Sequence, residues 1–344
     1  MRVAVAMSGG VDSSLAAARL KQAGYNVFGI YMQLWSGQNL EPIVSDLEHT
    51  CQLLDIPFYQ LDLEADFHRL VIDHFCREYS HGRTPNPCIV CNQRIKFGLL
   101  LDRALEMGAE YLATGHYARI ESTPDGYRLF KAADQSKDQS YFLYTLGQRQ
   151  LEHLLFPLGE LSKEKVRRLA AELGLPTANR HESQDICFIP DNDYRSFITE
   201  RIPLKEGEIV DITGKVLGRH VGLAQYTVGQ RHGLGLTSSG QLYVLKLDAL
   251  SNRLVVGTRD QLLHSMLVAT KPSWVSGEAA KESITITAKV RYKAPEVTAE
   301  LHPSDSVAEV RFITPQSAIT PGQSVVFYQG DVVLGGGIID AVLC

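Results

Sequence analysis

The chain has 344 residues, of which 44% are hydrophobic and 21% charged, which is ordinary for a globular protein and too long for one small core. The formal net charge of −5 excludes a protein that binds nucleic acid through bulk positive charge, so an RNA partner would have to meet local basic patches. No apolar run reaches the roughly 18 residues of a membrane-spanning helix, and the first residues lack an export-signal pattern, so we expect a cytoplasmic protein without a membrane partner.

In the first third of the chain, predicted strands alternate with predicted helices. Apolar runs predict strands at 2–7, 26–32, 57–62 and 110–116. Helical spacing of apolar residues predicts helices between them, at 13–23, around 44–54, around 67–75 and from about Asn92 onward. This alternation predicts a parallel α/β sheet with helices on both faces, and ligands of such sheets gather at the carboxyl ends of the strands.

The second half of the chain becomes strand-like. A last helix is expected at 161–176, with Ser162 as its N-cap and Gly174 past its end. After about Pro203, short alternating runs separated by glycine-containing turns predict two small β-rich domains. We therefore expect three domains: an α/β domain at 1–202 with a helical part at about 140–202, a central β domain at 203–262, and a C-terminal β-barrel at 263–344.

A glycine turn, Ser8-Gly9-Gly10-Val11-Asp12-Ser13, connects the first predicted strand to the first predicted helix. Glycines let the backbone approach a ligand, and the N–H groups and dipole of a helix start suit an anion. The turn has no lysine, so it does not match G-x-x-x-x-G-K-[ST], and it does not match G-x-G-x-x-G either. The alternative is an ordinary strand–helix turn in which Asp12 or Ser13 is the N-cap.

Six cysteines in a chain without an export signal indicate thiols rather than a disulfide framework. Cys88 and Cys91 form a C-x-x-C just before a predicted helix, so the helix dipole and the nearby Lys96 predict a reactive Cys91 thiolate. Cys187 lies far along the chain in a loop-like stretch and is the second candidate thiol. Half of a zinc site is the alternative, and it would have to recruit Cys76, His81 or Cys187.

The glycine turn resembles the S-G-G-x-D-S motif of the PP-loop ATP pyrophosphatases, which cleave ATP between its α- and β-phosphates. Other stretches resemble the bacterial tRNA-specific 2-thiouridylases within that group: T-P-N-P-x-x-x-C-N-x-x-I-K-F from Thr84, A-T-G-H-Y-A-R at 113–119, K-D-Q-S-Y-F-L at 137–143, I-C-F-I at 186–189, Y-T-V-G-Q-R-H-G-L-G at 226–235, V-R-Y-K-A-P at 290–295 and T-P-G-Q-S-V-V-F-Y at 320–328. Their order and number make the resemblance specific and extend it over nearly the whole chain.

The resemblance implies that ATP adenylates the C2 oxygen of the wobble uridine, position 34, in certain tRNAs, with release of pyrophosphate. A persulfide then supplies sulfur and AMP leaves. The persulfide would form on Cys187, and Cys91 would be the nucleophile that releases its sulfur as hydrosulfide or through a transient disulfide bond. Mg²⁺ would accompany ATP, the tRNAs would be the lysine, glutamate and glutamine acceptors, and a donor protein fed by a cysteine desulfurase would supply the sulfur.

The resemblance also implies the residues of the site. ATP would be held by Ala6, Met7, Ser8, Gly9, Gly10, Val11, Asp12 and Ser13, with Met32 and Gly115 near the adenosine. The target base would be bordered by Asn86, Pro87 and Cys88. The tRNA would be contacted by His116, Lys137, Asp138, Gln139, Arg291, Tyr292 and Gln323.

Several alternatives stay open at this point. Many family members have Asp where this chain has Cys88, so the general-base role assigned to that Asp is open here, and three cysteines would permit a 4Fe–4S cluster as the rival sulfur-handling device. The rival functions are another PP-loop ATP pyrophosphatase acting on a small molecule, and an RNA- or metal-binding module with a vestigial nucleotide loop. The basic face of the 161–176 helix is either solvated or in contact with tRNA, and it consists of Lys163, Lys165, Arg167 and Arg168.

Overall fold

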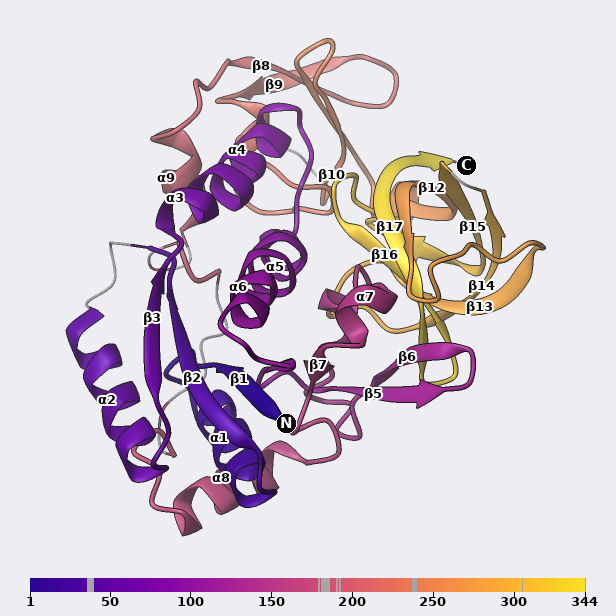
Figure 1. Cartoon of the computed structure of the whole chain (residues 1–344). Coiled ribbons are helices and arrows are strands. Elements are labelled where there is room, and N and C mark those ends of the chain that lie inside the picture. Colours follow the sequence, from indigo (N-terminus) through magenta and orange to yellow (C-terminus); the bar gives the residue numbers. More distant parts are fainter. Residues whose placement is uncertain are drawn as a thin grey trace.

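The first sheet of the computed structural model is parallel and confirms the predicted α/β layer. The structure describes residues 1–35, 40–178, 180, 186–189, 191, 193–236, 240–304 and 306–343. The sheet has the strand order β3-β2-β1-β4-β7, and Figure 1 shows β1, β2 and β3 side by side. Its strands are β1 (Arg2–Ala6), β2 (Asn26–Gln33), β3 (Phe58–Asp62), β4 (Tyr111–Ala113) and β7 (Leu154–Leu155).

Helices cover both faces of this sheet. The helices in the described part of the whole chain are α1 (Val11–Gln22), α2 (Leu40–Leu53), α3 (Glu64–Phe67), α4 (Asp73–Ser80), α5 (Pro87–Cys91), α6 (Leu101–Glu106), α7 (Gln148–Leu151), α8 (Lys163–Glu172) and α9 (Tyr194–Thr199), with π-helical turns at η1 (His68–Ile72) and η2 (Asn92–Leu100) and 3₁₀ turns at η3 (Ser140–Phe142), η5 (Leu223–Gln225) and η6 (Arg259–Leu262). Side chains of a strand alternate between faces, so Val3 and Val5 pack with α1, α2 and α8, while Ala4 and Ala6 pack with η2 and α6. This two-sided burial explains why the first strand is an uninterrupted apolar run. None of the described helices has the length and apolar character needed to cross a bilayer.

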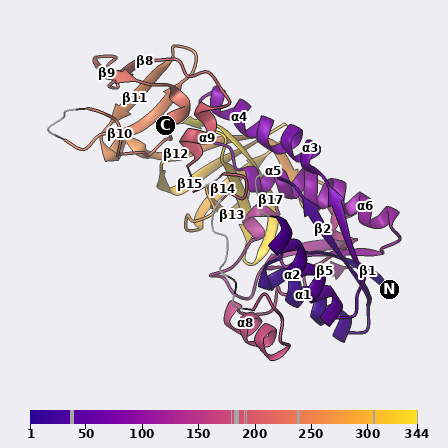
Figure 2. The same ribbon diagram turned by 90° about the vertical axis from the view of Figure 1, so that its left-hand side faces the viewer.

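A small four-stranded sheet follows, with the order β10-β11-β8-β9. Its strands are β8 (Gly207–Val210), β9 (Val216–His220), β10 (Tyr243–Asp248) and β11 (Arg253–Gly257). It encloses its own core around Ile209, Val244 and Leu254. Figure 2 shows this sheet at one end of the molecule and α1, α2 and α8 at the other.

The last six strands close into a barrel, because β12 pairs with both β15 and β17. They are β12 (Leu263–Trp274), β13 (Ile284–Lys289), β14 (Val297–Pro303), β15 (Val307–Ser317), β16 (Ser324–Gln329) and β17 (Val332–Leu343). The three sheets follow one another as expected, and on that basis we propose the domain boundaries 1–202, 203–262 and 263–344.

One connection was not predicted from the sequence. A hairpin of the first domain, β5 (Ala118–Thr123) and β6 (Gly126–Lys131), extends the barrel sheet by pairing with β17, where Phe130 lies opposite Val332. Tyr141, which lies outside the hairpin, packs in the same buried cluster as Val326 of the barrel. The first domain and the barrel therefore share a hydrophobic core. Figure 1 shows β5 and β6 beneath the barrel.

The Tyr141 hydroxyl provides a test of this shared core. It is fully buried and donates to the Ser324 carbonyl at 2.8 Å. Tyr141→Phe should lower the free energy of unfolding by about 1–2 kcal/mol, because the Ser324 carbonyl loses a buried partner. The matched control is Tyr243→Phe, which removes an exposed hydroxyl bond to Gln241 and should cost less than about 0.5 kcal/mol. Urea unfolding followed by tryptophan fluorescence measures the free energy of unfolding of both variants. Equal losses in the two variants would contradict the role given to Tyr141.

Candidate active site at the glycine loop and the cysteines

The glycine turn lies at the carboxyl end of β1, where the chain enters α1. Gly9 has a φ of +78°, a left-handed conformation that favours glycine, and Gly10 is the N-cap of α1 without a side-chain hydrogen bond. Hydroxyl groups brace the turn, since Ser13 Oγ accepts from the Ser8 N–H at 3.1 Å and the Ser14 hydroxyl donates to the Gly10 carbonyl at 3.1 Å. The first-turn N–H groups of α1 are thus not used by a side-chain cap, as an anion site requires.

A lysine from a distant helix lies beside this loop. Lys163 Nζ contacts both carboxylate oxygens of Asp12, at 2.8 and 2.7 Å, and the Tyr117 hydroxyl donates to Asp12 Oδ1 at 2.7 Å. Lys163 is only 8% exposed, because it begins α8 on the face that also buries Val166 and Ala170. The expectation that Lys163 lies on a solvated or tRNA-binding face is therefore wrong. Its spacing of three and seven residues from those apolar positions was the sequence signal for burial.

Arg180 is a second cation at the loop that sequence reasoning missed. Its Nη1 donates to the Gly9 carbonyl at 2.8 Å, and its Nη2 contacts the Asp46 carboxylate. The loop is also packed closely against the end of β4. A Cβ atom on Gly115 would lie 2.8 Å from the Ser13 nitrogen, which explains why this position requires glycine. Four other nucleotide contacts were predicted. Ala6 ends β1 and Met7 follows it, Val11 begins α1, and Met32 lies at the same edge of the sheet near the end of β2.

The helix that carries the cysteines begins earlier than predicted. It starts at Pro87, and Asn86 is its N-cap, whose Oδ1 accepts from the N–H groups of Cys88 at 3.1 Å and Ile89 at 3.4 Å. Cys88 is therefore in the first turn, and Cys91 is one turn further on and buried. The sequence-based argument placed Cys91 at the helix N-terminus, and this was wrong because the Asn-Pro pair, a strong helix start, precedes the cysteines.

The structure brings Cys88, Cys91 and Cys187 close enough for their charges to interact. Burial raises the pKa of Cys91 to about 12, and the positive charge of Lys96 offsets this only in part. Burial likewise raises the pKa of Cys187 to about 11 and that of Cys88 above its ordinary value, although both side chains reach solvent. The expected low-pKa thiol is thus corrected: desolvation disfavours the thiolate more than Lys96 stabilises it.

His116 lies next to the glycine that packs against the nucleotide loop. It follows Gly115, and its ring lies between Phe97 and Phe156, with centroids 5.5 and 6.0 Å away. Burial lowers the pKa of His116 well below its ordinary value, and the charge of Lys96 lowers it further, so the imidazole is neutral. The charge of Lys96 also acts on all three thiols, so Lys96 influences both His116 and the cysteines.

The predicted tRNA contacts lie around this region in different settings. The Asp138 carboxylate is buried and accepts from the Ala132 N–H at 3.0 Å and the Ser140 hydroxyl at 2.7 Å. Gln139 Oε1 accepts from the Tyr117 N–H at 2.9 Å. Asp138 and Gln139 therefore shape the loop that also carries the half-buried Lys137.

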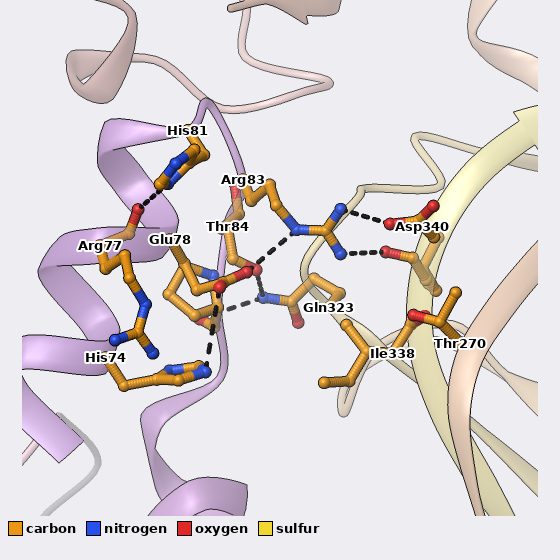
Figure 3. A network of polar contacts seen from close by, with 12 residues as sticks. His74, Arg77, Glu78, His81, Arg83, Thr84, Thr270, Gln323, Ile338 and Asp340 are labelled. Carbon is orange, nitrogen blue, oxygen red and sulfur yellow. Dashed lines mark hydrogen bonds and ion pairs between the residues drawn. The ribbon is translucent and has the colours of Figure 1, made fainter. Parts of the chain in front are cut away.

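The predicted contacts in the last domain lie on the barrel. Arg291 and Tyr292 follow β13 in a turn, where Arg291 is exposed and the Tyr292 ring packs 4.4 Å from that of Phe142. Gln323 Nε2 donates to the Thr84 carbonyl at 2.9 Å, which Figure 3 shows. Gln323 thus contacts the segment that leads to Cys88.

Cysteine, histidine and carboxylate side chains of this region are also candidate metal ligands. Within the part of the chain that the structure describes, no three His, Cys, Asp or Glu side chains are arranged to hold a metal ion. Cys88, Cys91 and Cys187 are free thiols in that part of the chain. Cys344 lies outside the described residues.

The raised pKa of Cys91 gives a prediction for its reactivity. Its alkylation by iodoacetamide should be slow near pH 7 and increase about tenfold per pH unit up to about pH 10, because the thiolate fraction rises with pH everywhere below a pKa of about 12. In the urea-unfolded chain, the rate should level off above the ordinary thiol pKa of about 8.5. Mass spectrometry of the Cys91 peptide measures both rates. A plateau near pH 7 in the folded protein would contradict the buried-thiol assignment.

Comparison with known proteins covers the whole chain. The tRNA methyl transferase HUP domain matches residues 1–191, the tRNA methyl transferase PRC-barrel domain matches 195–258, and the aminomethyltransferase beta-barrel domain matches 264–339. Among solved structures, the U34-tRNA thiolase NcsA from Methanococcus maripaludis has 18% identity and a TM-score of 0.37 over 58% of this chain and 63% of that one, too low to assign any feature of the site.

Two curated relatives match nearly end to end. The tRNA-specific 2-thiouridylase MnmA 2 of Thermoanaerobacter sp. (strain X514) is 47% identical over 358 residues, which are 99% of this chain and 98% of the relative. The tRNA-specific 2-thiouridylase MnmA of Geotalea uraniireducens (strain Rf4) is 50% identical over 356 residues, covering 98% and 95%. Because this identity extends along nearly the full length and all three domains match, the chain belongs to the tRNA-specific 2-thiouridylase MnmA family.

Proposed function

We propose that this protein uses ATP to adenylate the C2 oxygen of the wobble uridine of tRNA and replaces that oxygen with sulfur. The products are 2-thiouridine, AMP and pyrophosphate. Besides family membership, the observation that supports the proposal is a shared electrostatic environment: Lys96 acts on Cys88, Cys91 and Cys187 and also on His116, which follows Gly115 at the nucleotide loop. The alternative function, an ATP pyrophosphatase that acts on a small molecule, does not account for the paired thiols or for the two added β domains.

At the nucleotide end, we assign the phosphates to the loop at the start of α1. The C2 oxygen attacks the α-phosphorus and pyrophosphate leaves, so negative charge must be stabilised at the leaving phosphates. The Lys163 ammonium beside Asp12 supports this role, because it brings to the loop the positive charge that a lysine within the loop brings elsewhere. Mg²⁺ would arrive with ATP, and the Asp12 carboxylate is the group beside the loop that would face it.

At the sulfur end, Cys187 would carry the persulfide and Cys91 would release its outer sulfur. The Cys91 thiolate attacks Cys187 Sγ and displaces hydrosulfide, which adds to C2, and AMP then leaves with the electrons of the C2–oxygen bond. In the other order, the outer sulfur adds to C2 first and Cys91 then breaks the sulfur–sulfur bond. Both routes leave a Cys91–Cys187 disulfide that an external thiol must reduce before the next turnover.

The target uridine would enter beside the α5 start, since Asn86, Pro87 and the exposed Cys88 lie there next to the other thiols. A base modified at C2 must leave its stack to reach such a site. We assign the surrounding tRNA contacts to His116, Lys137, Asp138, Gln139, Arg291 and Tyr292, whereas the Gln323 amide donates to the Thr84 carbonyl. The substrates would be the lysine, glutamate and glutamine tRNAs, and a donor protein fed by a cysteine desulfurase would supply the sulfur.

Cysteine substitutions test the sulfur transfer. Cys91→Ser and Cys187→Ser should each abolish 2-thiouridine formation, detected by mass spectrometry of tRNA nucleosides, because a hydroxyl can neither carry nor release persulfide sulfur. Both variants should still release pyrophosphate from ATP in the presence of tRNA, because neither thiol acts in adenylation. Cys76→Ser is the matched control, since Cys76 is a half-buried thiol on α4 and should leave thiolation largely intact.

Three outcomes would contradict this assignment. Full turnover by either variant would exclude the two-thiol mechanism. Activity that follows the iron content of the wild-type protein, rather than its persulfide, would favour the cluster-dependent thiolase. Wild-type protein that consumes ATP with a small-molecule acceptor but never thiolates tRNA would favour another ATP pyrophosphatase.

Lys163→Met tests the nucleotide end. It should lower the rate of tRNA-dependent pyrophosphate release by about 100-fold, the usual effect of removing one group that stabilises developing charge. Lys165→Met, an exposed lysine on the next part of α8, is the matched control and should leave the rate within about twofold. Asp12→Asn should weaken the use of Mg·ATP. Unchanged pyrophosphate release by Lys163→Met and Asp12→Asn, with thermal unfolding confirming folded proteins, would exclude the loop as the ATP site.

A further inference from the structure

The segment that precedes the cysteines is held by the C-terminal barrel. Residues 83–85 connect α4 to the Asn86 cap of α5, and they run alongside the residues that start β16. The Thr84 N–H donates to the Pro321 carbonyl at 2.9 Å. Gly322 makes the approach so close that a Cβ there would lie 2.7 Å from the Thr84 nitrogen, and its φ of +93° also favours glycine.

The side-chain amide of Gln323 forms hydrogen bonds with the same segment. Its Nε2 donates to the Thr84 carbonyl at 2.9 Å and reaches the Pro85 carbonyl at 3.5 Å. Its own main chain is fixed in the barrel, because its N–H donates to the Thr320 carbonyl and its carbonyl accepts from the Ile339 N–H at 2.8 Å. The amide of Gln323 is therefore directed at protein main chain, as Figure 3 shows.

The Arg83 side chain extends from this segment to the barrel. Its guanidinium donates to Asp340 Oδ1 at 2.7 Å and to the Ile339 carbonyl at 3.1 Å, both on β17. Its Nε also donates to Glu78 of α4 at 3.0 Å, so the side chain joins α4 and the barrel in one network (Figure 3). Arg83 is about one-quarter exposed, which strengthens these charged hydrogen bonds relative to a surface pair.

These contacts are connected to the thiols by a short segment whose backbone is restricted. Pro85 and Pro87 restrict the backbone on either side of Asn86, and Asn86 caps the helix turn that holds Cys88 and ends at Cys91. The start of β16 is itself braced from the first domain, since the Tyr144 hydroxyl lies 3.0 Å from Ser324 Oγ. A shift of the barrel contact would therefore be passed to the helix turn rather than absorbed by a loop.

We propose that the barrel is a positioning element for the thiols, in which Gln323 and Arg83 fix the main chain of 84–85 and so set the depth at which Cys91 is buried. Gln323 acts in this way through protein main chain and not by contact with tRNA. The inference rests on the proposed function for its catalytic consequence, but the burial of Cys91 can be measured without activity.

The experiment follows the alkylation of Cys91 by iodoacetamide in the full-length protein at fixed pH, read by mass spectrometry. Gln323→Leu removes the amide donors at similar volume and should raise the Cys91 rate about tenfold, equivalent to about 1.4 kcal/mol. Gln316→Leu is the matched control, because Gln316 is also on the barrel and donates to two successive carbonyls, those of Thr314 and Pro315, but within its own strand. Its rate should stay within about twofold of the wild type.

Two further measurements separate positioning from tRNA contact. In Gln323→Leu, the tRNA dissociation constant should change by less than about twofold while kcat for thiolation falls by about tenfold or more, since a small misplacement of a reacting group is costly. Asp340→Asn, which weakens the half-exposed partner of Arg83, should raise the Cys91 rate in the same direction and serves if Gln323→Leu does not fold.

An unchanged Cys91 rate in both variants overturns the proposal. If tRNA affinity is then lost, Gln323 is a tRNA contact. A wild-type protein that forms no 2-thiouridine would refute the proposed function, whereas the alkylation rates would still decide whether the barrel positions the thiol.

Discussion

The ion pair between Asp12 and Lys163 joins residues 151 positions apart in the chain, and the nucleotide side of the site is arranged around it. It fastens α8 to the start of α1, and removal of either partner would leave a charge without compensation in a largely desolvated place. A nucleotide that separated this pair on entering the loop would have to supply each partner with a new counter-charge. Phosphate oxygens would compensate Lys163, and a divalent cation would compensate Asp12.

Desolvation also determines the protonation of the three thiols. Lys96 favours the ionised form of all three thiols, but burial outweighs its charge and keeps their pKa values high. A buried, protonated thiol resists adventitious alkylation and oxidation, which depend on thiolate character and access. Once ionised, a thiol of high pKa is also a stronger nucleophile, as the cleavage of a persulfide requires. Protection and reactivity thus both follow from the depth of Cys91.

That depth depends on a part of the chain outside the first domain. The β5–β6 hairpin, the buried Tyr141 and the contacts of Arg83 and Gln323 join the first domain to the barrel over a continuous surface. The barrel closes on itself through the β12–β17 pairing, but the β5–β6 hairpin extends its sheet and the two domains share a buried cluster. Its contribution to the reaction is therefore expected in the geometry of the thiols as much as in the binding of tRNA.

Much of this protein could be predicted from sequence, and the successes and errors have identifiable causes. Apolar runs and their spacing predicted the four longer strands of the first sheet, since these strands are buried on both faces and repeat a local pattern. The glycine turn was expected between the first strand and the first helix, and the structure has it there, with Gly10 as the N-cap of α1. The helix start at Pro87 was missed because a capping signal was overlooked, and Lys163 was misplaced because a charged residue on an apolar face was assumed to be solvated.

The sequence by itself determined the longer strands of the first sheet, the loop at α1 and the kinds of side chain at the candidate site, because these follow from residue order and local spacing. Only the tertiary structure decided which distant groups meet. It paired Lys163 with Asp12, brought Arg180 to Gly9, placed Cys187 beside Cys91 and set Gln323 on the Thr84 carbonyl. It also decided the pKa of Cys91, since desolvation is the combined effect of every element packed around a group and leaves no trace in the residues next to it along the chain.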